Sequence, residues 1–111
     1  YIVDVKTTRY ENNSDIFRRT VKQLYYELSA ALYCEIAYQV YGKLFDFYWL
    51  VISKSDISTE VYKASSHTLN EGAALVNKAL VLYNKCKELG VWPETPAELP
   101  KVATKHEIIE I

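Results

Sequence analysis

Residues 1–6 of the chain read YIVDVK, and apolar and polar side chains alternate along them. This period of two predicts a β-strand with one apolar face and one partly polar face. Asp4 and Lys6 lie two residues apart, so the strand places both side chains on the same face, about 7 Å apart along the backbone. We expect this strand to be central in its sheet. Because this strand begins at residue 1, we also expect the sequence to be a piece of a longer domain.

Two helices are predicted after this strand. Residues 7–13 are polar and turn-rich, and Asn13 or Ser14 can cap a helix that continues to Leu24. From Tyr25 onward, apolar side chains recur at steps of three and four residues until Gly42, where a helix can end in a left-handed conformation.

Two strands and a long helix follow. Residues 45–53 (FDFYWLVIS) are too apolar for a half-exposed strand, and residues 58–64 predict a shorter one. The turn-sized link at 54–56 indicates an antiparallel hairpin whose second strand lies nearer an edge. Residues 65–89 have helical periodicity and stop at Gly90, while three prolines between 93 and 100 exclude a regular element there. The order β-α-α-β-β-α predicts an α/β (α+β) fold, a mixed β-sheet flanked by helices.

Composition limits the classes of function. Half of the 111 residues are apolar, which suits one domain. The chain has 13 Lys and Arg against 14 Asp and Glu, so it has no net positive charge that would attract a polyanion. Cys34 and Cys86 belong to no metal or disulfide pattern, which favours a reducing, cytoplasmic setting. The most apolar stretch, 30–52, carries charges that a bilayer core would penalise, so we expect no membrane association.

The Asp4 and Lys6 pair suits metal-assisted hydrolysis of a phosphodiester. A carboxylate can hold a hard cation such as Mg²⁺, and a lysine can orient or deprotonate the attacking water or neutralise developing charge. The alternative is a surface ion pair on the wet face of a strand, which is common. One carboxylate is too few to organise Mg²⁺ by itself.

Four segments together resemble the exodeoxyribonuclease VIII (RecE-type) PD-(D/E)XK nucleases in order and spacing: YIVDVKTTR, YYELSAALY, FDFYWLVISK and ELGVWPETP. The resemblance covers most of the chain and implies a restriction-endonuclease-like core. It implies that residues 1–100 are the C-terminal half of the nuclease domain and that 101–111 are a C-terminal tail. It also implies that an acid of the site lies on a strand before residue 1.

Residue roles follow from the resemblance only where the motifs match. Asp4 resembles the metal-binding acid and Lys6 the catalytic lysine, and Thr7 belongs to the Thr-Thr pair that follows them. Tyr33 resembles the tyrosine of the family's Gln-x-x-x-Tyr helix motif. Ser29 stands where the family has glutamine, which removes an amide from the site. The resemblance assigns DNA contacts to Thr7, Ser29 and Tyr33.

Basic side chains after the first strand are candidates for the DNA backbone. Arg18 and Arg19 lie near Lys22 in the first helix, and Arg9 lies in the loop before it. A solvated helix face is an equally good interpretation. Tyr25 and Tyr26 could stack on a base, although core packing is the better interpretation for both.

The resemblance implies a Mg²⁺-dependent DNA exonuclease, with Mn²⁺ as a substitute, that resects double-stranded DNA ends in phage-type recombination. It also implies a bacterial or phage-borne protein, a single-strand annealing protein as partner, and a homo-oligomer. Without the upstream acid, we expect weak Mg²⁺ binding and an inactive chain. A catalytically inactive DNA-binding or assembly module is the alternative, and a plain interaction domain is a third.

Overall fold

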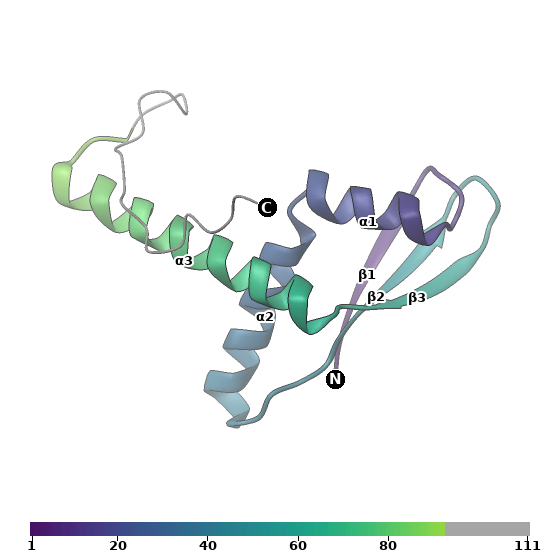
Figure 1. Cartoon of the computed structure of the whole chain (residues 1–111), viewed down its shortest axis with the longest axis horizontal. Helices are drawn as coiled ribbons and strands as arrows, with labels where there is room; N and C mark the ends of the chain where they lie inside the picture. The colour runs from purple at the N-terminus through teal and green to yellow at the C-terminus, as the bar shows by residue number, and fades with distance from the viewer. Residues whose placement is uncertain (93–111) are drawn as a thin grey trace. The chain divides into compact units, whose positions relative to one another are not determined.

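The computed structural model describes residues 1–92. The chain divides into two compact units, Tyr1–Ala73 and Ala74–Ile111, and each is described by itself. The first unit holds the sheet, two helices and the first two turns of a third helix (Figure 1). In the second unit the rings of Tyr83 and Trp92 pack with their centroids 5.4 Å apart. The predictions for the prolines from 93 and for the tail 101–111 lie outside the described residues.

Three strands form a mixed sheet in the order β1-β2-β3. β1 (Ile2–Thr8) pairs in parallel with β2 (Phe47–Ser53), and β3 (Thr59–Lys63) pairs antiparallel with β2. The predicted hairpin is therefore confirmed. The prediction that the first strand is central is wrong for the described residues, because β2 has a neighbour on both sides and β1 has only β2. The chain passes from β1 through α1 and α2 to β2, which pairs beside β1. The short hairpin then places β3 on the other side of β2, so β2 lies in the middle.

The three helices begin and end close to the predicted residues. α1 (Ser14–Gln23) is capped by the Asn13 side chain, whose Oδ1 accepts hydrogen bonds from two backbone amides at 2.8 and 3.1 Å. α2 (Tyr26–Tyr41) ends at Gly42 and α3 (Ser66–Leu89) at Gly90. Both glycines have positive φ, +68° and +66°, so a left-handed residue ends each helix as predicted.

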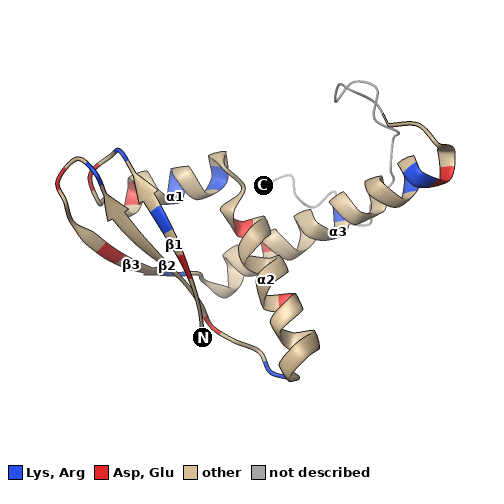
Figure 2. Ribbon diagram, turned by 180° about the vertical axis from the view of Figure 1, so that it is seen from behind, with Lys and Arg blue, Asp and Glu red and all other residues tan. Residues whose placement is uncertain are grey.

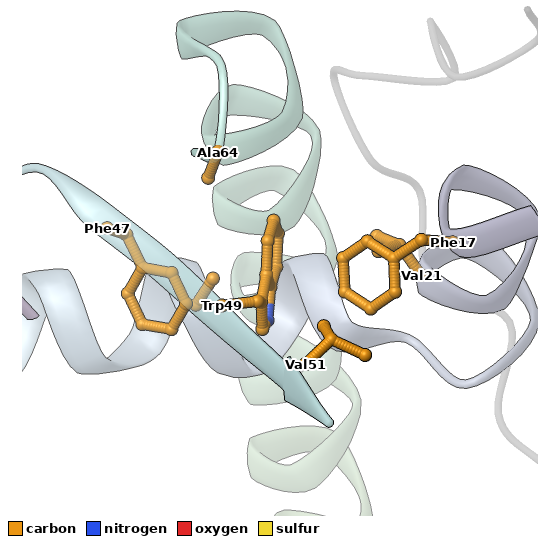
Figure 3. Packing of buried hydrophobic residues seen from close by; sticks show 7 residues of the cluster. Phe17, Val21, Phe47, Trp49, Val51 and Ala64 are labelled. Carbon is orange, nitrogen blue, oxygen red and sulfur yellow. The ribbon is translucent and has the colours of Figure 1, made fainter. Parts of the chain in front are cut away.

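The core lies between β2 and the helices, within the first unit. Figure 3 shows Trp49 of β2 between Phe47 and the α1 residues Phe17 and Val21, with Val51 beside it. All five side chains are at least 92% buried. Trp49 meets Phe17 and Phe47 edge to face, with centroids 5.5 and 5.3 Å apart. These contacts fix α1 over the sheet.

The two faces of the sheet differ in cover. Phe47, Trp49, Val51 and Ser53 are buried, whereas the side chains between them, among them Ile52, are half-buried or exposed. The prediction that residues 45–53 are buried on both faces is therefore wrong, because the described helices cover one face. The open face carries exposed apolar side chains, namely Tyr1, Val3, Val5, Ile52 and Val61, beside exposed polar side chains such as Thr7 and Lys63. Among the described residues, no helix is long and apolar enough to cross a membrane.

Candidate active site

Asp4 and Lys6 lie on the covered face of β1. The strand register places Asp4 beside Trp49 and Lys6 beside Val51, two core residues of β2. The two charged positions follow each other along β1 in Figure 2. Their side chains are only 21% and 28% exposed, respectively. The interpretation as an ion pair on a wet face therefore does not fit, since the wetter side of β1 carries Val3 and Val5.

The Asp4 carboxylate has unused acceptor capacity. Its Oδ2 lies 3.1 Å from Lys6 Nζ, close enough for an ion pair. The same oxygen is buried and has no hydrogen-bond partner among the described residues, so the contact is one of charge without hydrogen-bond geometry. A buried oxygen of this kind favours a cation as a further partner.

The donor set nevertheless remains incomplete for a metal. Within residues 1–92 there is no group of three or more His, Cys, Asp or Glu side chains that could hold an ion. Asp4 therefore fits as one ligand of a Mg²⁺ ion, whose other ligands would be water, phosphate oxygens or other protein groups.

The aromatic ring of Tyr26 lies next to the lysine. Lys6 Nζ is 4.5 Å from the ring centroid, within the range of a cation–π contact. Tyr26 is half-buried and also packs against Phe17, so core packing and a contact with the site occur together. The sequence favoured packing over stacking on a base, and it did not predict the contact with Lys6, because that distance depends on how α2 packs against β1.

Ser29 and Tyr33 share a helix face with Tyr26. They follow Tyr26 by three and seven residues, which places them along one side of α2. The Tyr33 ring stacks on Phe47 with centroids 6.4 Å apart, and Phe47 is the register partner of Ile2. Tyr26 contacts Lys6, and Tyr33 contacts Phe47 of β2. The roles of Ser29 and Tyr33 in the site stay predictions.

Thr7 and Arg9 do not join this face. Thr7 is exposed and, one residue after Lys6, points to the opposite side of the sheet, and its contact with DNA stays a prediction. Arg9 is exposed beyond the end of β1, with its guanidinium carbon 5.4 Å from the Tyr10 ring centroid.

Arg18 and Arg19 line a separate pocket of about 840 Å³ between α1, β3 and the first turns of α3. Asp4 and Lys6 are not among its lining residues. Arg18 forms an exposed ion pair with Asp15 at 2.8 Å, and Arg19 Nε donates to the Asp15 carbonyl at 3.5 Å. The structure places both arginines at this pocket, and their contact with the DNA backbone stays a prediction.

Glu27 is a buried acid that the sequence analysis did not single out. It is 2% exposed, and its Oε2 lies 4.0 Å from Lys22 Nζ, which also pairs with Glu71. Burial raises the pKa of Glu27 above its ordinary value, and the charge of Lys22 opposes part of that rise. The sequence signal for a close helix contact at Glu27 was Gly72, a glycine in the middle of a helical pattern. At Gly72, α3 approaches the Glu27 backbone.

Comparisons with known proteins agree with this geometry. The profile of a family described as a PDDEXK-like domain of unknown function (DUF3799) matches residues 1–102. A solved structure from Eubacterium rectale, described as a candidate exonuclease, superposes with a TM-score of 0.64 at 17% sequence identity. The match covers 98% of this chain and 46% of that one, so the chain spans about half the length of the solved structure. No curated protein matches the sequence.

The mixed sheet with its flanking helices, taken with these two matches, defines a restriction-endonuclease-like α+β domain of the PDDEXK-like class. The chain belongs to the family of PDDEXK-like domains of unknown function (DUF3799). The predicted fold class is confirmed.

Proposed function

We propose that this chain is the C-terminal half of a Mg²⁺-dependent exodeoxyribonuclease domain of the RecE type and holds the lysine and one acid of its active site. The observation that carries the proposal is the buried Asp4 oxygen without a hydrogen-bond partner, 3.1 Å from Lys6 Nζ. The family and the fold support the nuclease class. A second acid would come from the part of the domain that this chain does not span.

The residues have distinct tasks in phosphodiester hydrolysis. Asp4 would hold Mg²⁺, or Mn²⁺ in its place, and the bound ion would supply Lewis-acid stabilisation of the phosphate charge. Lys6 orients the attacking water through its ammonium N–H groups and neutralises charge that develops on the phosphate. Water adds to phosphorus, one P–O bond breaks, and the leaving oxygen takes up a proton.

The substrate in this proposal is the end of double-stranded DNA. Ser29 and Tyr33 follow Tyr26 on the same side of α2, and a hydroxyl of either would donate to a phosphate oxygen. The proposed setting is the cytoplasm of a bacterium, with a bacterial or phage-borne gene. A ring-shaped homo-oligomer and a single-strand annealing partner belong to the same proposal.

The test is digestion of linear duplex DNA with Mg²⁺ by the whole protein that contains this chain. Lys6→Ala should lower kcat/KM by about 100-fold or more, the scale of a lost proton-transfer or charge-stabilising group. Lys63→Ala is the matched control, because Lys63 is an exposed strand lysine paired with Asp46 at 3.6 Å. Equal activity of the wild type and Lys6→Ala would overturn the proposal.

Metal binding has a readout that does not depend on cleavage. Mg²⁺ should raise the thermal unfolding midpoint of the wild type as it saturates the site, and Asp4→Asn should remove this dependence. Because Asp4 supplies one carboxylate, the isolated chain should need millimolar Mg²⁺ and should not cleave DNA. A metal-dependent shift that persists in Asp4→Asn would place the ion elsewhere.

A catalytically inactive DNA-binding or assembly module is the second candidate. Ser29 favours it, because a serine in the glutamine position of the helix motif shortens the reach to a phosphate or a water. This candidate predicts salt-dependent binding of duplex DNA by the whole protein without cleavage in Mg²⁺ or Mn²⁺.

A further inference from the structure

We infer that Tyr26 is a positioning residue that holds the Lys6 ammonium in the site when Asp4 is occupied by a cation. The inference rests on the proposed function and adds a residue to that site. Its starting point is that Lys6 Nζ has two attractive neighbours, the Asp4 carboxylate at 3.1 Å and the Tyr26 ring at 4.5 Å from the centroid.

The two neighbours differ in what happens when a metal binds. A divalent cation on Asp4 Oδ2 would use the oxygen that faces Lys6 and would bring like charge near the ammonium. The attraction from Asp4 then weakens and repulsion from the ion appears. The face of an aromatic ring still attracts a cation under these conditions, because the metal binds the carboxylate and leaves the quadrupole of the ring unchanged.

The ring is held independently of Lys6. Tyr26 packs against Phe17 with centroids 6.3 Å apart, and Phe17 in turn stacks on Tyr62 at 4.6 Å and meets Trp49 edge to face. The ring therefore rests on the aromatic core of the first unit and does not depend on the lysine for its position.

The backbone before Tyr26 directs this ring inward. Tyr25 has φ +56° and ψ +39°, a left-handed conformation that a bulky side chain rarely adopts. This turn separates α1 from α2 and leaves the Tyr25 ring 60% exposed, while the next residue, Tyr26, packs on the core. Backbone strain of this kind persists where the surrounding structure requires it and is frequent near functional sites.

Substitutions at position 26 in the whole protein separate the electronic effect of the ring from its volume. Tyr26→Phe keeps the ring face and should retain kcat on duplex DNA within about twofold, whereas Tyr26→Leu should lower kcat by roughly 3- to 30-fold, the range of a cation–π contact. The KM for DNA should change little, because Lys6 acts on the reacting phosphate. Phenylalanine analogues with one, two or three ring fluorines should lower kcat progressively, since fluorine weakens the negative face and hardly changes the volume of the ring.

The control and the stability readout exclude a packing defect. Tyr38→Leu removes an exposed ring from α2, outside the Tyr26 and Lys6 contact, and should leave kcat unchanged. The fluorinated variants should share the unfolding midpoint of Tyr26→Phe. A loss of activity that follows the unfolding midpoint and not the number of fluorines would overturn the positioning role.

A readout without catalysis keeps the inference separate from the proposed function. Ring currents should shift the Lys6 Hε resonances upfield in the wild type and in Tyr26→Phe, with and without Mg²⁺, and not in Tyr26→Leu. If the wild type shows this shift but does not cleave DNA, the proposed function fails and the contact stands. If the shift is absent or disappears with Mg²⁺, the inference fails whatever the activity.

Discussion

Glu27 shows at the scale of a single residue how burial changes a charge. It is 2% exposed, and loss of hydration raises the pKa of its carboxyl while Lys22 lowers it in part. The folded state therefore binds a proton on Glu27 more tightly than the unfolded state does. Its contribution to stability declines as the pH rises from the ordinary carboxyl range through the raised pKa, and it is constant on either side of that window.

Glu27→Gln should remove this pH dependence. We expect the free energy of unfolding of the variant at pH 8 to equal or exceed that of the wild type, by up to about 1 kcal/mol, and to lose any advantage near pH 4. Chemical denaturation at a series of pH values measures the difference. Glu35→Gln on the exposed side of α2 is the control, and it should follow the wild-type curve. A Glu27→Gln curve parallel to the wild type would show that Glu27 is not perturbed by burial.

At the scale of elements, α2 and the first turns of α3 meet at a glycine. A Cβ added to Gly72 would collide with the carbonyl oxygen of Glu27 and lie 2.6 Å from its carbonyl carbon and 3.0 Å from Ala31 Cβ. Two of these atoms are backbone and cannot move aside cheaply. Gly72 therefore allows close helix packing in the interior of α3, where glycine is otherwise unfavourable.

Gly72→Ala should destabilise the chain by about 1–3 kcal/mol, the cost of overpacking. Helix propensity alone predicts the opposite sign, a gain of up to about 1 kcal/mol. The exposed neighbour gives the control, because Ala73→Gly measures propensity without a collision. Urea denaturation of both variants decides the matter, and a more stable Gly72→Ala would show that the two helices are not in this contact.

At the scale of the whole molecule, the sheet of the first unit exposes apolar side chains on one face. Val5 is 57% exposed and Val61 56% exposed, and Ile52 on β2 between them is 37% exposed. Apolar side chains are thus exposed on the same face of three adjacent strands, and exposed apolar surface promotes association.

The 111-residue chain by itself should therefore associate as its concentration rises. Sedimentation velocity should show larger species at high concentration, and Val5→Lys should shift the distribution toward the monomer. Lys63→Glu changes charge without removing an apolar side chain, and it tests whether charge alone explains the effect. If the chain stays monomeric at every concentration, it does not associate through the open face of the sheet.

The amino-acid sequence by itself determined the elements and their order. The alternation in residues 1–6, the Asn13 cap, the glycines at 42 and 90 and the turn at 54–56 are local signals, because period and backbone conformation depend on neighbouring residues. The same alternation placed Asp4 and Lys6 on one face. The resemblance to PD-(D/E)XK nucleases rested on the spacing of these segments, and it agrees with the family to which the chain belongs.

Only the tertiary structure decided which face of β1 is covered, that β2 lies between β1 and β3 among the described strands, and that Tyr26 reaches Lys6. A strand with period two has two faces, and the sequence of that strand does not say which one the helices will cover. The contact of Tyr26 with Lys6 and the burial of Glu27 depend on how the helices pack against elements distant in sequence. Packing of that kind is a property of the assembled core, to which residues far apart in the sequence contribute together.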